Sequence, residues 1–269
     1  MQNDLQNKLD KIKLELTNYK KVLIALSGGV DSCLAAYLSR THLGKGNAVA
    51  VISNSESLKQ KDFDIAIDFC KEFDIKYEVV FTKELENENY ASNPNNRCYF
   101  CKFELYSLMN NLIQEKYAGY NIINGNNYSD LGDYRPGLQA SSELEANSIF
   151  INCKITKEDI RKLAHYFELP VWNKPASPCL SSRFPYGQHI TKEKLLQVET
   201  AENILNNFGF EDVRVRNYNN TAKIEVPKHL LAKLKDNFEQ IKDKVLSLGF
   251  SECVIDEEGL VSGKLNRAL

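Results

Sequence analysis

The chain lacks long apolar runs and any excess of basic charge. Hydrophobic residues make up 43% of its 269 positions, enough for a core, but no apolar stretch is long enough to span a bilayer. The formal net charge is −2, so the composition gives no sign of a nucleic-acid-binding surface. Residues 1–4 are polar and acidic rather than signal-like. We therefore expect a cytoplasmic protein with neither a membrane nor a nucleic acid as partner, folded as one large domain or two moderate ones.

Histidines are also scarce. The four in the chain stand singly, and none has a partner at the spacing of a zinc site. The seven cysteines are an odd number in a chain without an export signal, which argues against a disulfide framework. Four of them lie among apolar neighbours and are predicted core residues: Cys33, Cys70, Cys153 and Cys253. The other three need a different explanation.

Apolar stretches typical of strands alternate with helical patterns through the first two thirds of the chain. Strands are expected at residues 21–26, 48–52, 76–81, 121–123 and 149–152, and helices at residues 5–16, 31–43, 59–73, 101–117, 135–145 and 157–167. This alternation predicts an α/β fold with a doubly wound parallel sheet. Residues 83–97 are charged and non-periodic, which predicts a long loop.

A cluster of prolines marks the predicted domain junction, with residues 1–178 before it and residues 179–269 after it. The second part predicts a small α+β domain. Its expected helices are residues 191–207 and 227–248, and its expected strands are residues 212–216, 222–226 and 252–256. The asparagine-rich residues 217–220 predict a hairpin turn between the first two of these strands, because asparagine tolerates left-handed backbone angles.

The segment Ser27-Gly28-Gly29-Val30-Asp31-Ser32 directly follows the first predicted strand and opens a predicted helix. Glycines let backbone N–H groups approach an anion, and a helix N-terminus adds partial positive charge. Ser27 and Ser32 add hydroxyl donors. No Gly-Lys-Ser/Thr follows, so the segment is not a Walker A loop. It predicts a phosphate site, and a chance serine-glycine turn is the alternative.

Two further polar segments follow predicted strands, at the edge where ligands bind to parallel sheets. Ser53 and its neighbours follow the second strand, either as a nucleoside contact or as an ordinary polar loop. Gly125 and the residues after it follow the fourth strand. There, Asp130 or Asp133 is predicted either to hold Mg²⁺ or to belong to an Asx-rich turn that caps a helix.

Cys98 and Cys101 form a lone C-x-x-C, compatible with half of a zinc site, a redox pair or an iron–sulfur corner. Cys179 lies between prolines, serines and Arg183, which is not a core-like setting. It is predicted to be a reactive thiol, with an inert linker cysteine as the alternative.

Alternation along a strand places Arg214 and Arg216 on one face and two valines on the other. Paired guanidinium groups suit a phosphate or a carboxylate, whereas the plain alternative is the solvated face of a half-buried strand. Glu199 and Glu202 share a helix face and are expected to pair with these arginines or to bind a metal.

Together these segments resemble the LarE family of PP-loop ATP pyrophosphatases over nearly the whole chain. The resemblance is carried by SGGVDS at 27–32, GNNYSDLGDYRPG at 125–137, WNKPASPCLSSRFPYG at 172–187 and VRVRNYNNTAKIEV at 213–226. Ser129 departs from the family, which more often has an acidic residue there, and residues 147–152 fit the pattern poorly.

The resemblance implies that Mg-ATP adenylates a carboxylate of pyridinium-3,5-biscarboxylic acid mononucleotide and that sulfur then displaces AMP. In one branch of the family, the cysteine matching Cys179 gives up its own sulfur and becomes dehydroalanine. In the other, three cysteines bind a [4Fe-4S] cluster that relays sulfide. The presence of Cys98 and Cys101 beside Cys179 resembles the cluster branch. A homo-oligomer, a small nucleotide substrate and a sulfide source are further implications.

The expected sites follow from the motifs and the resemblance together. ATP is expected at Ala25, Ser27, Gly28, Gly29, Asp31, Ser32, Ser53, Gly125 and Asp130; the substrate at Arg183, Glu202, Arg214 and Arg216; the cluster at Cys98, Cys101 and Cys179, with Cys179 catalytic. Competing hypotheses are the single-use sulfur donor, an amide-forming enzyme of the NAD synthetase type, a tRNA thiolase and a non-catalytic nucleotide sensor.

Overall fold

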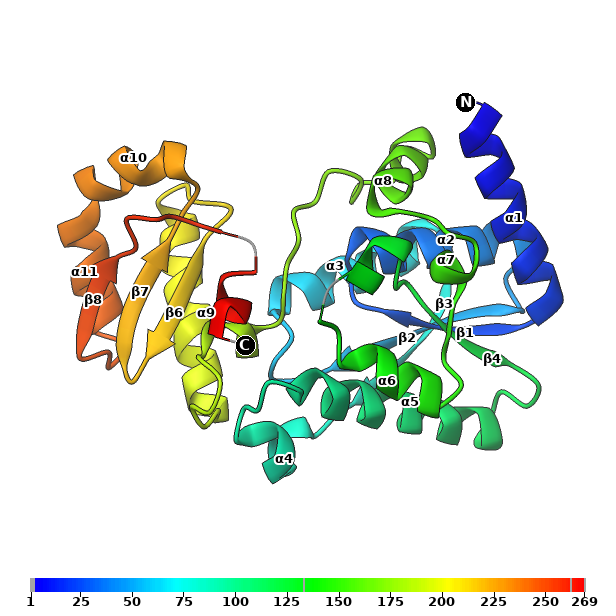
Figure 1. The fold of residues 1–269 in the computed structure, drawn as a ribbon, viewed down its shortest axis with the longest axis horizontal. Helices are drawn as coiled ribbons and strands as arrows, with labels where there is room; N and C mark the ends of the chain where they lie inside the picture. The colour runs from blue at the N-terminus through cyan, green and yellow to red at the C-terminus, as the bar shows by residue number, and fades with distance from the viewer. Residues whose placement is uncertain (1–2, 133, 262, 269) are drawn as a thin grey trace. The chain divides into compact units, whose positions relative to one another are not determined.

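The computed structural model describes residues 3–132, 134–261 and 263–268, so Asp133 lies outside the described residues. Within that part, the chain forms two compact units (Figure 1). The first comprises residues 3–84 and 96–177, and the second comprises residues 85–95 and 178–268. The chain therefore passes from one unit to the other three times, after residues 84, 95 and 177.

The first unit is built on a five-stranded parallel sheet, as the alternating pattern predicts. Its strands are β1 (Val22–Leu26), β2 (Ala48–Asn54), β3 (Lys76–Phe81), β4 (Asn121–Asn124) and β5 (Asn147–Ser148). The spatial order is β3-β2-β1-β4-β5, and the chain changes direction across the sheet at β1. The doubly wound α/β fold is confirmed. In such a sheet, the crevice beyond the carboxyl ends of the strands at this switch point is where ligands bind.

Helices cover both faces of this sheet (Figure 1). On one face lie α1 (Asn3–Tyr19), α2 (Val30–Leu43), α3 (Gln60–Glu72), α7 (Ile149–Asn152) and α8 (Lys157–Tyr166). On the other face lie α5 (Arg97–Glu115) and α6 (Gly137–Glu143). Val22 and Ile24 point into the first layer and Leu23 into the second, as the two-residue period of a strand requires. None of the described helices has the length and apolar character needed to cross a bilayer.

One strand prediction in this unit is wrong. Residues 149–152 form α7, and only Asn147–Ser148 pair with β4. Ile149 and Phe150 are both fully buried in the same core cluster. A strand would send these consecutive side chains to opposite faces of the sheet, whereas one helical turn places both in the core.

The second unit is a small three-stranded sheet packed against helices. Its strands are β6 (Arg214–Tyr218), β7 (Thr221–Glu225) and β8 (Glu252–Ile255), with β6 antiparallel and β8 parallel to β7. The helices are α9 (Lys192–Asn207), α10 (Leu231–Asp236) and α11 (Phe238–Leu246). Asn219 and Asn220 both have positive φ, 48° and 74°, which makes the two-residue hairpin turn between β6 and β7. The single helix expected over residues 227–248 is wrong, because Asn237 separates α10 from α11.

Residues 85–95 are not the plain loop that their composition predicts. They contain the short helix α4 (Glu88–Ala91), and they pack within the second unit. Tyr90 is buried, with its hydroxyl 2.6 Å from Ser181 Oγ. Asn93 Nδ2 donates to the Pro185 carbonyl at 2.7 Å, and Asn93 O accepts from Gly187 N at 2.8 Å. These long-range bonds anchor the segment, and no local sequence pattern reveals them.

Candidate functional site

The turn after β1 has the geometry of an anion site. Gly28 has a φ of 70°, and a Cβ on it would lie 2.4 Å from the backbone oxygen of Asp62. Glycine is therefore required on both conformational and steric grounds. Ser32 Oγ lies 3.2 Å from both Ser27 N and Ser27 Oγ and donates to Gly29 O at 3.1 Å. Gly29 has no side chain to cap α2, so the helix N-terminus is left to a ligand or solvent.

The loop after β4 packs backbone to backbone against this turn. A Cβ on Gly125 would lie 2.6 Å from Ser32 N, so the two chain segments approach more closely than any side chain permits. Asn124 is buried at the end of β4, and its Oδ1 accepts from Asn126 N at 3.0 Å. The sequence predicts that these two segments meet, and the structure brings them together.

Asp31 is held by two groups that the sequence did not single out. Asn127 Nδ2 donates to Asp31 Oδ1 at 3.2 Å, and Lys157 Nζ forms an ion pair with Asp31 Oδ2. Lys157 is the first residue of α8, and its backbone N–H donates to Ser129 Oγ at 3.2 Å. A carboxylate and an ammonium group thus lie together at the start of α2, where both can meet a nucleotide phosphate or its counter-ion.

Asp130 adopts the capping geometry that was its alternative interpretation. Its Oδ2 accepts from Asn127 N at 3.0 Å, and its Oδ1 pairs with Arg135 Nη2 at 2.7 Å. These contacts fix the 3-10 turn at Tyr128–Gly132. Ser129 directs its hydroxyl to the α8 backbone instead of serving as an acidic group.

Polar residues at the carboxyl ends of β2 and β3 form a second polar group, in which Ser53 lies within β2 and not after it as the sequence predicts. Ser53 Oγ lies 2.8 Å from Thr82 Oγ1. Ser55 and Ser57 donate their hydroxyls to Glu84 Oε1, while Glu84 Oε2 is buried without a hydrogen-bond partner among the described residues. The predicted contact residue Ala25 is half-buried in β1. The edge of the sheet beside the turn is therefore rich in acceptors and hydroxyls.

The cysteines divide as the sequence predicts. Cys33, Cys70 and Cys253 are buried, and Cys153 is half-buried. Burial raises the pKa of all four thiols, to about 12 for Cys70 and about 11 for Cys153 and Cys253. These thiols stay protonated and inert at neutral pH.

Cys98 and Cys101 are the second and fifth residues of α5. Cys98 is exposed and Cys101 is half-buried. Residues three apart share a helix face, so the two sulfur atoms can serve one ligand. Cys179 is half-buried and belongs to the second unit. Within neither unit do the described residues gather three histidine, cysteine, aspartate or glutamate side chains able to hold a metal.

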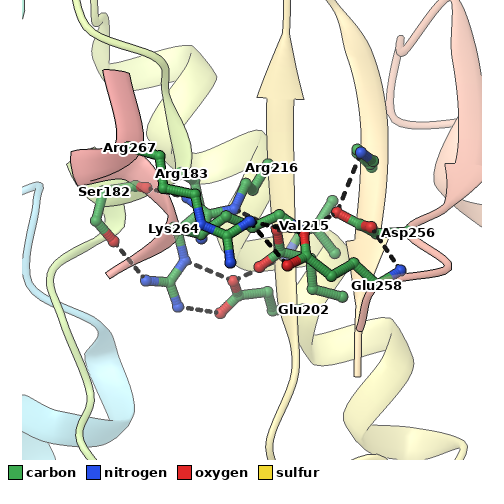
Figure 2. A network of polar contacts seen from close by, with 11 residues as sticks. Ser182, Arg183, Glu202, Val215, Arg216, Asp256, Glu258, Lys264 and Arg267 are labelled. Atoms are coloured by element: carbon green, nitrogen blue, oxygen red, sulfur yellow. Dashed lines mark hydrogen bonds and ion pairs between the residues drawn. The ribbon is translucent and has the colours of Figure 1, made fainter. Parts of the chain in front are cut away.

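Arg183 organises the turn that carries Cys179. Its Nη1 donates to the Pro178 carbonyl at 3.0 Å and to Ser182 Oγ at 2.8 Å. Its Nε and Nη2 pair with the two oxygens of Glu202 at 2.7 and 3.1 Å, a bidentate pair that is almost fully buried (Figure 2). Glu202 Oε1 also accepts from Val215 N at 3.1 Å. The Cys179 turn is thereby fixed to α9 and β6.

Arg216 is likewise buried and paired, so the solvated-face interpretation fails for it. Its Nε pairs with Glu225 at 2.6 Å, and its Nη1 donates to the Ser182 carbonyl at 3.1 Å (Figure 2). Lys264 from the C-terminal end of the chain reaches Glu225 at 3.4 Å and also pairs with Asp256. Charged side chains from the Cys179 turn, α9, the sheet and the residues after β8 are thus paired with one another within the second unit.

Arg214 differs from its neighbours. It is half-buried and makes no hydrogen bond or ion pair with any residue in the described part of the chain. Burial lowers the pKa of its guanidinium group, and the positive charges of Arg183 and Arg216 lower it further. The carboxylates of Glu225 and Asp212 act in the opposite direction without preventing the net lowering, so a guanidinium group at this position could still accept an anionic ligand.

Two residues that make contacts here, Asp62 and Lys157, lie outside the segments that the sequence singles out, whereas Asn127 and Lys174 lie inside them without a predicted role of their own. Each is an ordinary polar residue within a helix or loop pattern, and only the tertiary structure shows its partner. Arg183 and Glu202 were singled out, but their mutual pairing was not.

The comparisons with known proteins agree with this geometry. A family model described as NAD synthase matches residues 2–97, which include the turn after β1. An uncharacterised protein of Synechocystis is 41% identical over 98% of this chain and 99% of its own length. The pyridinium-3,5-bisthiocarboxylic acid mononucleotide synthase of Lactiplantibacillus plantarum is 34% identical over 94% of this chain and 92% of its own length.

A more distant relative, an NH3-dependent NAD(+) synthetase of Methanococcus aeolicus, is 28% identical over 75% of this chain and 81% of its own length. The part matched by the NAD synthase family model, residues 2–97, includes the turn after β1. The similarity to the synthase covers 94% of this chain and therefore includes most of both units. The chain therefore belongs to the LarE family of ATP-dependent enzymes, within the PP-loop ATP pyrophosphatases.

Proposed function

We propose that this protein is an ATP-dependent sulfurtransferase acting on pyridinium-3,5-biscarboxylic acid mononucleotide. It adenylates each carboxylate and converts it to a thiocarboxylate. The observation that carries the proposal is the presence of two parts in one chain. These are a phosphate-binding turn after β1 and a thiol, Cys179, held in a polar turn by Arg183. The similarity to the synthase of L. plantarum, which spans both parts, supports it.

In the first step, a substrate carboxylate oxygen attacks the α-phosphorus of ATP, and pyrophosphate leaves. Backbone N–H groups at the start of α2, with the hydroxyls of Ser27 and Ser32, bind the departing phosphates. Asp31 has the oxygen donors that Mg²⁺ prefers, and the ion would neutralise phosphate charge there. Lys157, which now pairs with Asp31, would then be available to the phosphates.

In the second step, sulfur attacks the carbonyl carbon of the acyl adenylate, and AMP leaves with the oxygen. Arg214 binds the phosphate of the substrate, since its guanidinium group has no partner among the described residues. Arg216, Arg183 and Glu202 hold Arg214 and the Cys179 turn in place through their buried ion pairs. We assign the first unit to nucleotide binding and the part after residue 178 to substrate binding and sulfur transfer.

We further propose that Cys98, Cys101 and Cys179 ligate a [4Fe-4S] cluster. Three thiols suit such a cluster and leave one iron open, which can hold sulfide for transfer. Cys98 and Cys179 each lie within three residues of a point where the chain passes between the units. Two thiols three residues apart at the start of α5 are compatible with such a cluster. We also propose a homo-oligomer, which the family resemblance implies.

The function is tested by mass spectrometry of the products. The protein is incubated with Mg-ATP, sulfide and the biscarboxylate mononucleotide. We expect pyrophosphate, AMP and a product in which sulfur replaces carboxylate oxygen. Ammonia replaces sulfide in a parallel reaction. An amide product from ammonia, with no thiocarboxylate from sulfide, would instead support the synthetase-type activity of the more distant relatives.

The sulfur source is tested by iron analysis after purification without oxygen. We expect about four irons per chain, lost in Cys98→Ala, and repeated turnover in the presence of sulfide. A protein that gains no iron on reconstitution, and whose Cys179 becomes dehydroalanine after one turnover, would establish the single-use donor.

A further inference from the structure

Asp62 is a buried carboxylate that the proposed chemistry leaves without a role. It lies in the first turn of α3 and is 5% exposed. Lys174 Nζ donates to its Oδ1 at 2.7 Å, and Ser177 Oγ donates to its Oδ2 at 2.6 Å. Both partners come from the segment that leads to Cys179, more than a hundred residues away along the chain. A short charge-assisted pair of bonds thus ties that segment to α3.

The same contacts reach the phosphate-binding turn. Lys174 Nζ also donates to the Gly28 carbonyl at 2.7 Å. Gly28 itself rests on the Asp62 backbone, with no room for a Cβ. One ammonium group therefore joins three parts of the first unit, namely the turn after β1, the start of α3 and the segment before Cys179.

The segment is held at further points. Arg161 of α8 donates to the carbonyls of Trp172 and Lys174, each at 2.9 Å. Pro175 and Pro178 restrict its backbone freedom. Beyond Ser177, only Pro178 precedes Cys179. Because consecutive Cα atoms are about 3.8 Å apart, the Cα of Cys179 stays within about 8 Å of that of Ser177. Covalent geometry imposes this limit whatever position the second unit adopts.

We propose that Asp62, Lys174 and Ser177 form a tether that positions Cys179 for sulfur transfer. This inference rests on the proposed sulfurtransferase activity. If the thiol or bound sulfide lies too far from the acyl adenylate to react, water attacks the same carbonyl carbon instead. AMP then leaves as before, but the product is the original carboxylate. The tether thereby couples ATP consumption to sulfur transfer, and Ser177 acts as a positioning residue without touching the nucleotide.

The test replaces Ser177 by Ala and measures pyrophosphate and thiocarboxylate together. We expect pyrophosphate release within about twofold of the unaltered protein and thiocarboxylate formation reduced about tenfold, since small misplacements of reacting groups cost that much or more. Ser177→Thr keeps the hydroxyl and restores coupling. Ser247→Ala removes an exposed hydroxyl elsewhere and serves as the matched control. An unchanged ratio of thiocarboxylate to pyrophosphate in Ser177→Ala overturns the proposal.

A second measurement is independent of the proposed reaction. The rate at which N-ethylmaleimide modifies Cys179 is followed by peptide mass spectrometry in the unaltered protein and in Ser177→Ala, both freed of bound metal with a chelator so that all three thiols are available. We expect modification of Cys179 to be at least about twofold faster in the variant, because the tether no longer restricts the chain, while Cys98 and Cys101 react as before. Equal rates at Cys179 overturn the tether. If the unaltered protein forms no thiocarboxylate but the two alkylation rates still differ, the proposed function is wrong and the tether stands.

Discussion

At the scale of single residues, Arg214 and Arg216 lie on the same face of β6 but differ in their partners. Arg216 is buried, and its guanidinium group is occupied by Glu225 and a backbone carbonyl. Arg214, two residues earlier, has its guanidinium group half-buried and unoccupied by any described residue. Alternation explains the shared face, but only the tertiary partners distinguish the structural arginine from the one available to a ligand.

Arg214→Ala is expected to weaken binding of the mononucleotide substrate. A hydrogen-bonded ion pair with a phosphate group is worth about 1.5–3 kcal/mol, so the KM for the substrate should rise about tenfold or more while the KM for ATP is unchanged. Steady-state kinetics with each substrate varied in turn measures this. Lys235→Ala, which removes an exposed cation from the same unit, is the control. An unaltered substrate KM in Arg214→Ala would return this arginine to a structural role.

Gly28 is the residue on which the phosphate-binding turn depends most. Gly28→Ala must accommodate a Cβ 2.4 Å from the Asp62 oxygen at a φ of 70°. We expect a loss of about 1–3 kcal/mol in the free energy of unfolding, together with loss of ATP binding. Urea unfolding and calorimetric titration with ATP measure the two effects. Gly46→Ala, where a Cβ meets nothing within 4 Å, should change neither. A Gly28→Ala protein that binds ATP normally would contradict the assignment of the turn.

At the scale of secondary-structure elements, α8 links packing to the site. It supplies Lys157 to Asp31 and Arg161 to the segment before Cys179. Its start is fixed by a capping box in which Thr156 and Asp159 exchange hydrogen bonds, and Asp159 also pairs with Lys8 of α1. Burial opposes ionisation of Asp159, but the bonds from Thr156 and Lys8 outweigh it, and its pKa lies below the usual value.

Asp159→Asn is expected to destabilise the protein by about 1–2 kcal/mol at neutral pH. The pKa of Asp159 is lower in the folded protein than in the unfolded chain, where it is about 3.9. The ionised side chain therefore stabilises the fold fully above the unfolded-state pKa, and this stabilisation is lost as the pH falls through the folded-state pKa. The difference in free energy of unfolding between the two proteins should therefore shrink on acidification below about pH 4. Urea titrations at several pH values measure it, and a pH-independent difference would contradict this account of Asp159.

The sequence predicted elements best where periodicity was strong and local. The parallel sheet, the turn after β1 and the asparagine hairpin followed from short-range patterns. Residues 85–95 and α7 did not, because Tyr90 and Phe150 are buried by distant partners. At the site, the pairing of Arg183 with Glu202 and the contacts of Asp62 were equally hidden, since each joins segments far apart in the chain.

At the scale of the whole molecule, the chain forms two units and passes between them three times. The first holds the turn after β1, for which we propose phosphate binding, and the second holds Cys179 and Arg214, for which we propose sulfur transfer and substrate binding. We expect that adenylation and the sulfur-transfer step can be separated by substitution of Cys179, because the turn after β1 and Cys179 belong to different units, although Cys98 and Cys101 belong to the first.

The measurement that tests this most directly compares pyrophosphate release and thiocarboxylate formation in the unaltered protein and in Cys179→Ala. With Mg-ATP, substrate and sulfide present, we expect Cys179→Ala to release pyrophosphate and AMP while forming no thiocarboxylate. Formation of thiocarboxylate at the normal rate would show that Cys179 has no part in sulfur transfer. Loss of pyrophosphate release together with thiocarboxylate would contradict the division between the two units.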